Sequence, residues 1–169
     1  MRSDGLVALL TFAIFLGGCA TVAEGPSFSE ARAVTPMTGK ATVYVFRKYA
    51  EPTAWGSTIH FENQEVATLN QGGFTWAYLT PGPRTVRAVW AGMSGQNDSV
   101  ITLDVEAGST YYIELTGTTR FAGTEAGTLP GTYKMYFRVG SGMSVVNPAL
   151  AESVVSQCCR FQKPRSLEY

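Results

Sequence analysis

Residues 41–47 read Ala-Thr-Val-Tyr-Val-Phe-Arg and carry the strongest structural signal in the chain. The stretch is rich in β-branched and aromatic residues, which fit best on the pleated surface of a strand. Val43 and Val45 alternate with Tyr44 and Phe46, so both faces of the segment are apolar. A strand with two apolar faces has to be covered on both sides, so we expect it to lie at the centre of a sheet.

Short runs of similar composition recur toward the C-terminus, at 58–62, 65–69, 73–79, 84–91, 99–105, 110–115 and 133–139. Turn-forming residues separate them, as at Asn63-Gln64, where we expect Asn63 to take the left-handed conformation. Seven or eight strands joined by short turns bury their apolar faces most simply in two packed sheets. The sequence therefore predicts an all-β fold, an antiparallel β-sandwich.

Two longer loops interrupt this pattern, at 92–98 and at 116–131. The second is rich in Gly and Thr and has no strand assigned to it. Binding residues favour loops on a rigid scaffold, so we expect any specificity of this chain to lie in these two loops.

One C-terminal helix follows the strands. Asn147 is a good N-cap and Pro148 suits the first turn. Leu150, Val154 and Cys158 then recur with helical spacing, which predicts an apolar stripe that packs on the sandwich. An exposed partner-binding helix is the alternative. Residues 162–169 have no period and are interpreted as a tail.

The N-terminus carries an export signal. Arg2 precedes an apolar run at 6–16, about half the length that a membrane-spanning helix needs, and Leu16-Gly17-Gly18-Cys19 follows. This stretch resembles the lipobox of bacterial lipoproteins, which implies a signal peptide over 1–18 and an acylated Cys19. An ordinary signal peptide with an incidental cysteine, or a buried N-terminal helix, remains the alternative.

Lipidation of Cys19 would anchor the protein to a membrane, because each buried methylene adds about 0.8 kcal/mol. Ala20 follows the cysteine, which by the enteric sorting rule implies the outer membrane, with the domain facing the periplasm. Residues 19–40 would then form the lipidated cysteine and a flexible tether, and 41–161 the sandwich with its helix. A short helix around 29–33 packed on the domain is the alternative to the tether.

Several motifs resemble a bacterial lipoprotein family whose domain has no known function. They are Gly39-Lys40-Ala41 running into 43–47, Leu79 with Pro81-Gly82, and 105–108 followed by Tyr111-Tyr112-Ile113. The resemblance covers about residues 39–139 and extends to transthyretin-like and carboxypeptidase-regulatory-like sandwiches. It implies an immunoglobulin- or transthyretin-like fold more than an activity, because the matching residues belong to turns and core.

Composition excludes several classes of function. The 13 basic and 13 acidic residues give zero net charge, so there is no basic footprint for nucleic acid. A single histidine, His60, excludes a metal site or proton relay that needs two. Ser57 and Glu62 lie near it in sequence without a recognised catalytic spacing. We therefore expect no catalytic residue, no cofactor, no metal and no enzymatic activity.

Two other features carry candidate contacts. Cys158 and Cys159 are adjacent, so a bridge between them would close a strained ring, and we do not expect one. They are interpreted as two small apolar residues on the buried side of the helix, or as a cross-link to another chain. Trp55 stands in the polar stretch 51–56 and is the candidate partner contact.

Two functions remain. The first is a non-enzymatic envelope lipoprotein that acts as an interaction or assembly module, with an envelope protein as its candidate partner. The second is a glycan- or peptidoglycan-binding lipoprotein. A contiguous apolar patch along 117–131 would favour the first, whereas exposure of Trp55, Tyr112 and Tyr136 on a common face would favour the second.

Overall fold

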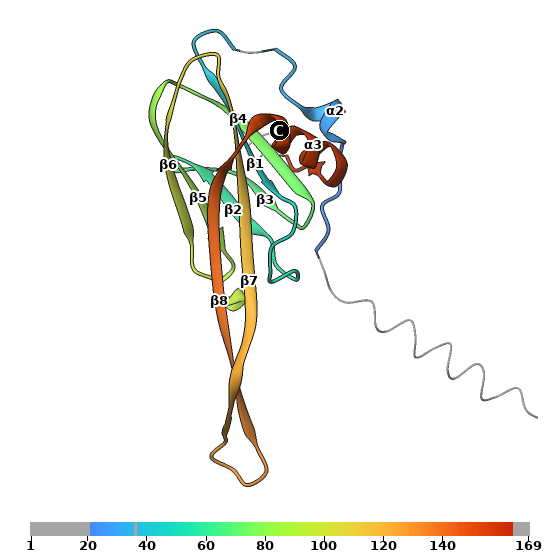
Figure 1. Ribbon diagram of the computed structural model, residues 1–169, viewed down its shortest axis with the longest axis vertical. Coiled ribbons are helices and arrows are strands. Elements are labelled where there is room, and N and C mark those ends of the chain that lie inside the picture. Colours follow the sequence, from blue (N-terminus) through green and yellow to red (C-terminus); the bar gives the residue numbers. More distant parts are fainter. Residues whose placement is uncertain (1–20, 36, 164–169) are drawn as a thin grey trace, which may run out of the picture.

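The computed structural model describes residues 21–35 and 37–163, which fold as two packed sheets with a C-terminal helix on one face (Figure 1). The all-β sandwich predicted from the sequence is confirmed. The strands are β1 (Ala41–Arg47), β2 (Ser57–Phe61), β3 (Gln64–Leu69), β4 (Gly73–Leu79), β5 (Gly82–Trp90), β6 (Ser99–Val105), β7 (Thr110–Ala126), β8 (Tyr133–Val146) and β9 (Arg160–Phe161). The helices are α2 (Phe28–Ala31), α3 (Pro148–Cys158) and the 3-10 turn η2 (Gly92–Ser94). No helix in the described ranges has the length and apolar character needed to cross a bilayer.

The larger sheet has the strand order β8-β7-β1-β4-β9 and the smaller one β3-β2-β5-β6. β1 occupies the middle of the larger sheet, as its two apolar faces predict. The sheet is not purely antiparallel, however, because β1 runs parallel to β7 and β4 runs parallel to β9. The two-residue strand β9 was not expected from the sequence; it exists because the chain leaves α3 beside the free edge of β4.

The alternation in β1 divides the apolar residues between two clusters. Val43 and Val45 are fully buried between the sheets, with Ile59, Val86 and Ile113 among their neighbours in the cluster. Such a cluster removes one face of each sheet from water and supplies most of the stabilisation of the sandwich.

The outer face of β1 is covered by the two helices. Tyr44 and Phe46 belong to a second cluster with Phe28 of α2 and with Ala151 and Val155 of α3. The predicted helix thus packs on the domain, but mainly through Ala151 and Val155, whereas Leu150 of the predicted stripe is exposed and Val154 and Cys158 are partly buried. Asn147 caps it as expected, because its side chain accepts a hydrogen bond from the Ala149 amide at 3.1 Å.

The described part of the expected tether packs on the sandwich. Phe28 is 3% exposed, and its ring lies 5.6 Å from Tyr44 and 5.4 Å from Phe74, centroid to centroid. The Ala33 amide donates a hydrogen bond to the Tyr44 hydroxyl at 2.9 Å. Residues 21–35 thus follow the alternative of a short packed helix, because Phe28 fills the apolar outer face of the sheet.

The turn after β2 also differs from the expectation. Glu62, with φ at 55°, takes the left-handed position that was assigned to Asn63. Its carboxylate accepts a hydrogen bond from the Thr85 amide and lies 3.7 Å from the guanidinium of Arg84, so contacts to β5 hold Glu62 in this conformation.

Arg47, at the end of β1, is fully buried, and within residues 21–35 and 37–163 it forms no ion pair with a carboxylate. Its guanidinium donates hydrogen bonds of 2.7 to 2.9 Å to four carbonyl oxygens, those of Ala50, Pro52, Trp55 and Leu69. The guanidinium carbon also lies 4.8 Å from the centroid of the Trp90 ring. Burial lowers the pKa of Arg47 to about 10, so the group stays charged at neutral pH.

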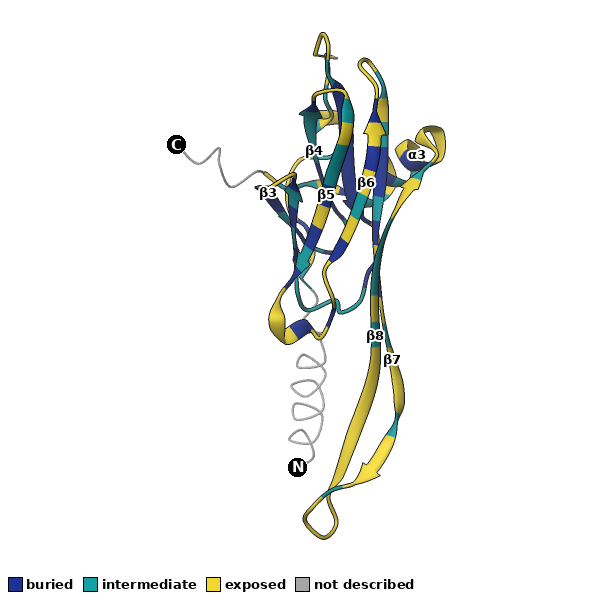
Figure 2. Cartoon of the chain, turned by 90° about the vertical axis from the view of Figure 1, so that its left-hand side faces the viewer, coloured by how far each residue is buried: buried dark blue, intermediate teal, exposed yellow. Residues whose placement is uncertain are grey.

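β7 and β8 continue beyond the body of the sandwich as a two-stranded hairpin (Figure 1). We call residues 119–139 the arm. Figure 2 shows most of it as exposed, in contrast to the buried residues of the body. The glycine- and threonine-rich segment 116–131 is therefore not a loop: most of it is strand, and only 127–132 form the turn.

We expect Arg47→Ala to lower the free energy of unfolding by about 4 kcal/mol or more, because several buried carbonyls lose their donor at once. Urea titration of the full chain measures this loss. Arg120→Ala removes the same side chain from an exposed position and should cost under about 0.5 kcal/mol. Equal midpoints for the two variants would contradict the structural role of Arg47.

We expect Phe28→Ala to cost about 3 kcal/mol, the range for removing a buried phenylalanine ring. Thermal unfolding checks this, with Val34→Ala as control because Val34 is 83% exposed. If residues 21–35 formed a free tether, the two substitutions would have the same negligible effect.

Candidate functional site

The pairing of β7 with β8 gives the arm two different faces. Paired residues of an antiparallel ladder share a face, and successive pairs alternate between faces. The register pairs Phe121 with Phe137, and after a bulge at Ala122 it pairs Thr124 with Met135. The bulge keeps both pairs on one side of the arm.

One face of the arm is apolar. It consists of Thr119, Phe121, Thr124, Ala126, Tyr133, Met135, Phe137 and Val139. Exposure is high along this apolar face: Phe121 is 60%, Phe137 54%, Met135 66% and Tyr133 72% exposed. The Phe121 and Phe137 rings meet edge to face at 5.9 Å in its middle. Leu129, 68% exposed, lies in the turn at the tip.

The opposite face of the arm is charged. It consists of Arg120 with Arg138, Gly123 with Tyr136, and Glu125 with Lys134. The Tyr136 hydroxyl donates a hydrogen bond of 2.7 Å to the Glu125 carboxylate, which raises the pKa of the tyrosine. Three basic residues and one acidic residue thus occupy this face, while the apolar face carries no charged residue.

The root of the arm is fastened to the loop that follows β1. The Glu51 amide donates to the Gly117 carbonyl at 2.9 Å, and the Glu51 carboxylate accepts from the Thr119 amide. The Gln96 side-chain amide bridges the carbonyls of Glu51 and Thr118 at 3.1 and 2.9 Å. Backbone and side-chain bonds together therefore set the direction in which the arm leaves the body.

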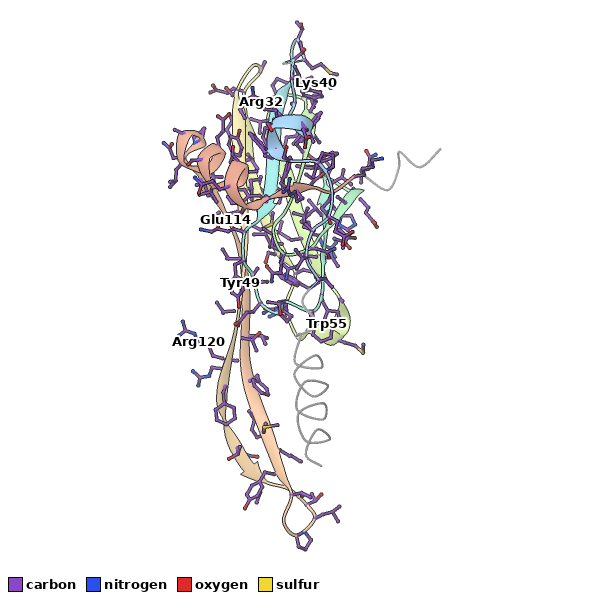
Figure 3. The ribbon with its side chains drawn as sticks, turned by 90° about the vertical axis from the view of Figure 1, so that its right-hand side faces the viewer. Arg32, Lys40, Tyr49, Trp55, Glu114 and Arg120 are labelled. Carbon is purple, nitrogen blue, oxygen red and sulfur yellow. A yellow bond between two sulfur atoms is a disulfide. The ribbon has the colours of Figure 1, made fainter. Side chains whose placement is uncertain are left out.

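A groove of about 590 Å³ lies where the arm meets the body. Phe137, Val139 and Thr119 of the apolar face line one side of it, and Trp55 and Met93 line the other, with Pro52, Ser94 and Gly95 completing the lining. Met93 is 85% exposed. Figure 3 shows Trp55 on one side of the arm and Arg120 directed away from that side.

The structure brings the candidate Trp55 together with the arm. Its side chain is half-buried in the groove, and its carbonyl accepts a hydrogen bond from Arg47. Tyr112 is 4% exposed and stacks on Tyr44 at 4.7 Å, whereas Tyr136 lies on the charged face of the arm. The three aromatics considered for a glycan site therefore do not share an exposed face.

The residues considered for catalysis have separate roles. Ser57 is buried, and its hydroxyl donates to the Val89 carbonyl at 3.3 Å. Glu62 contacts Thr85 and Arg84. His60 is half-buried on β2, between Glu65 of β3 and Arg87 of β5. These contacts do not assemble the three side chains into one site.

The two adjacent cysteines form a disulfide with each other, which corrects the expectation that they would not. α3 ends at Cys158, and Cys159 is extended, with φ at −118° and ψ at 147°. The expectation had placed both cysteines on a continuing helix, where neighbouring side chains diverge. Cys159 is 2% exposed in the outer cluster, so the other part of the interpretation, burial under the helix, is confirmed for this residue.

Two features of the site were not predicted from the sequence. Arg47 reads as the charged end of an apolar strand, and its role was not recognised. Only the β7 side of the arm was read as a loop, although Phe121 is an aromatic residue typical of strands. The strand predicted over 133–139 is confirmed as part of β8. The lipid-attachment candidate Cys19 lies outside the described residues.

The profile of a family described as a protein of unknown function, DUF2846, matches residues 37–128. The chain belongs to this family. The match extends from the segment before β1 into the turn at the tip of the arm, so the DUF2846 region includes β7 and excludes β8 and α3. No curated protein and no solved structure matches the chain.

We expect Gly117→Ala to destabilise the root of the arm by about 2 kcal/mol, because an added Cβ would lie 2.1 Å from the Glu51 carbonyl oxygen. Chemical denaturation measures the loss, and hydrogen exchange should quicken at Thr118 and Thr119. Gly142→Ala is the control, since its nearest neighbour would be Thr116 Oγ1 at 3.5 Å. A Gly117→Ala protein as stable as the control would contradict the described packing of the root.

Proposed function

We propose that this DUF2846 protein is a non-enzymatic envelope lipoprotein, anchored to a membrane through Cys19, whose arm is an interaction or assembly module. The observation that carries the proposal is the exposed apolar face of the arm. Exposed contiguous apolar patches mark interaction surfaces in soluble domains. The patch begins within 117–131, at Phe121 and Leu129, and continues along β8.

The form of the arm supports an interaction rather than a structural role. A two-stranded hairpin is marginally stable by itself in water, and this one carries its apolar residues outside the core. β8 is also the edge strand of its sheet. An edge strand with exposed apolar residues is a site at which another protein docks.

The position of Thr21, the first described residue, supports a membrane anchor near the root of the arm. The Thr21 amide donates a hydrogen bond of 2.9 Å to the Thr53 carbonyl, and Thr53 and Thr119 line one shallow pocket. Only two residues of chain separate a lipid on Cys19 from Thr21, and two residues span at most about 7 Å. An acylated Cys19 would therefore hold this end of the sandwich close to the membrane, in our proposal the outer membrane on its periplasmic side.

The anchor is tested by intact mass of the membrane-extracted protein. We expect loss of the first 18 residues, with acyl chains, palmitate among them, on the new N-terminal cysteine. Cys19→Ala should stall this processing or release the domain from the membrane, whereas Cys158→Ala should leave the acylation unchanged. A mature protein that begins elsewhere and carries no lipid would overturn the anchor.

The interaction module is tested by cross-linking in intact cells, followed by mass spectrometry of what is attached. We expect recovery of envelope protein from the wild-type chain and a loss of at least about tenfold in Phe137→Ser, which removes a central apolar contact. Tyr136→Ser is the matched control, because this neighbouring residue lies on the charged face. Recovery of muropeptides or polysaccharide in place of protein would establish the glycan-binding alternative.

A further inference from the structure

The two ends of the apolar face of the arm differ in shape, and the shape of one end complements that of the other. At the tip, Tyr133 projects from the molecule, 72% exposed. At the root, the same face leads into the groove between Val139 and Trp55. A projecting apolar end and an apolar hollow thus lie about 20 Å apart on one continuous strip, the span of six residues of strand.

We propose that the apolar face of the arm binds a second copy of this chain, with two arms packed face to face and antiparallel. This inference rests on the proposed function, because it names the partner of the same surface. In the pair, the tip of each arm lies in the root groove of the other. The contact is isologous, since each copy offers the same strip and receives the same strip. The twofold axis passes between the two pairs Phe121–Phe137 and Thr124–Met135.

The distribution of charged residues on the arm favours a second copy of the chain as the partner. The apolar face carries no charged residue, so two such faces meet without burying a charge or opposing like charges. Arg120, Lys134 and Arg138 lie on the opposite face and stay in water. The whole chain has zero net charge, so no long-range repulsion opposes self-association.

The area is sufficient for a specific contact. With the exposed fractions of Phe121, Tyr133, Met135, Phe137 and Leu129 all above one half, each arm offers about 600 Å² of apolar surface, and two arms would bury about 1,200 Å², the lower limit for specific interfaces. Anchoring in one membrane raises the effective concentration of the two copies, which makes a contact of this size adequate.

A flat bilayer does not fit the same surface. The groove is the inner corner between the arm and the body, and a planar surface resting on the arm leaves such a corner unfilled. The tip of an identical arm enters this corner with Tyr133 and Leu129. The second copy therefore fits both the strip and the groove.

The test uses two neighbouring residues on opposite faces of the arm. Thr124→Cys places a thiol beside the proposed twofold axis, and Glu125→Cys places one on the charged face. The full chain is produced in cells in two versions with different epitope tags and treated with a short bismaleimide, because packed sheets lie about 10 Å apart. We expect a covalent dimer containing both tags from Thr124→Cys and at least tenfold less from Glu125→Cys.

A second measurement compares the full chain in mild detergent by sedimentation. The wild-type protein and Tyr136→Ser should be dimers, and Phe137→Ser should dissociate at least about tenfold more readily. Phe137 is exposed, so its replacement leaves the core of the fold intact.

The outcomes separate this inference from the function on which it rests. If Thr124→Cys becomes attached to a different envelope protein, or if equal labelling occurs from both faces, the second copy is excluded while the interaction module stands. The inference is also overturned if the wild-type chain is monomeric at every concentration and Thr124→Cys gives no two-tag product. Absence of acyl chains on Cys19 overturns the anchor and leaves the dimer standing.

Discussion

The buried guanidinium of Arg47 is the contact on which the rest of the arrangement depends. A buried charge without a counter-ion is stabilised only by dipoles aimed at it, here the four carbonyls that accept its hydrogen bonds. Three of them belong to residues 50–55, so the charge determines the path of that loop. The loop in turn bonds to Gly117 and Thr119 and carries Trp55. One buried residue thus positions both the root of the arm and one wall of the groove.

The position of β1 explains how this contact is sheltered. Its alternating side chains occupy the core on one side and the helix-covered cluster on the other, which excludes water from the end of the strand where Arg47 lies. Low dielectric strengthens the bonds from the guanidinium to the carbonyls and makes the loss of any of them costly. Phe28 of α2 and Val155 of α3 complete the cover.

Strand and helix positions were largely predictable, whereas the extension of β7 beyond Leu115 into the arm was not. The limits of β1, β4, β6 and α3 follow from local alternation, turn residues and a helix cap, which act within a few residues. β7 was expected to stop at Leu115 because Gly117 and Gly123 interrupt the pattern and a bulge at Ala122 shifts its phase. Pairing with β8, about twenty residues away, restores the alternation. Contacts between distant segments also explain β9 and the packing of Phe28, which no local pattern specifies.

The exposure of the apolar face of the arm is best explained by a role in binding a partner. Residues that stabilise a fold are buried by it, but Phe121, Met135 and Phe137 stay more than half exposed. The opposite face carries charges at alternate positions, which keeps the free arm soluble and restricts association to one side. The sandwich supplies rigidity through Glu51 and Gln96 at the root, so binding needs little further ordering of the arm. A preorganised strip with one apolar side fits an assembly role better than a role in the stability of the domain.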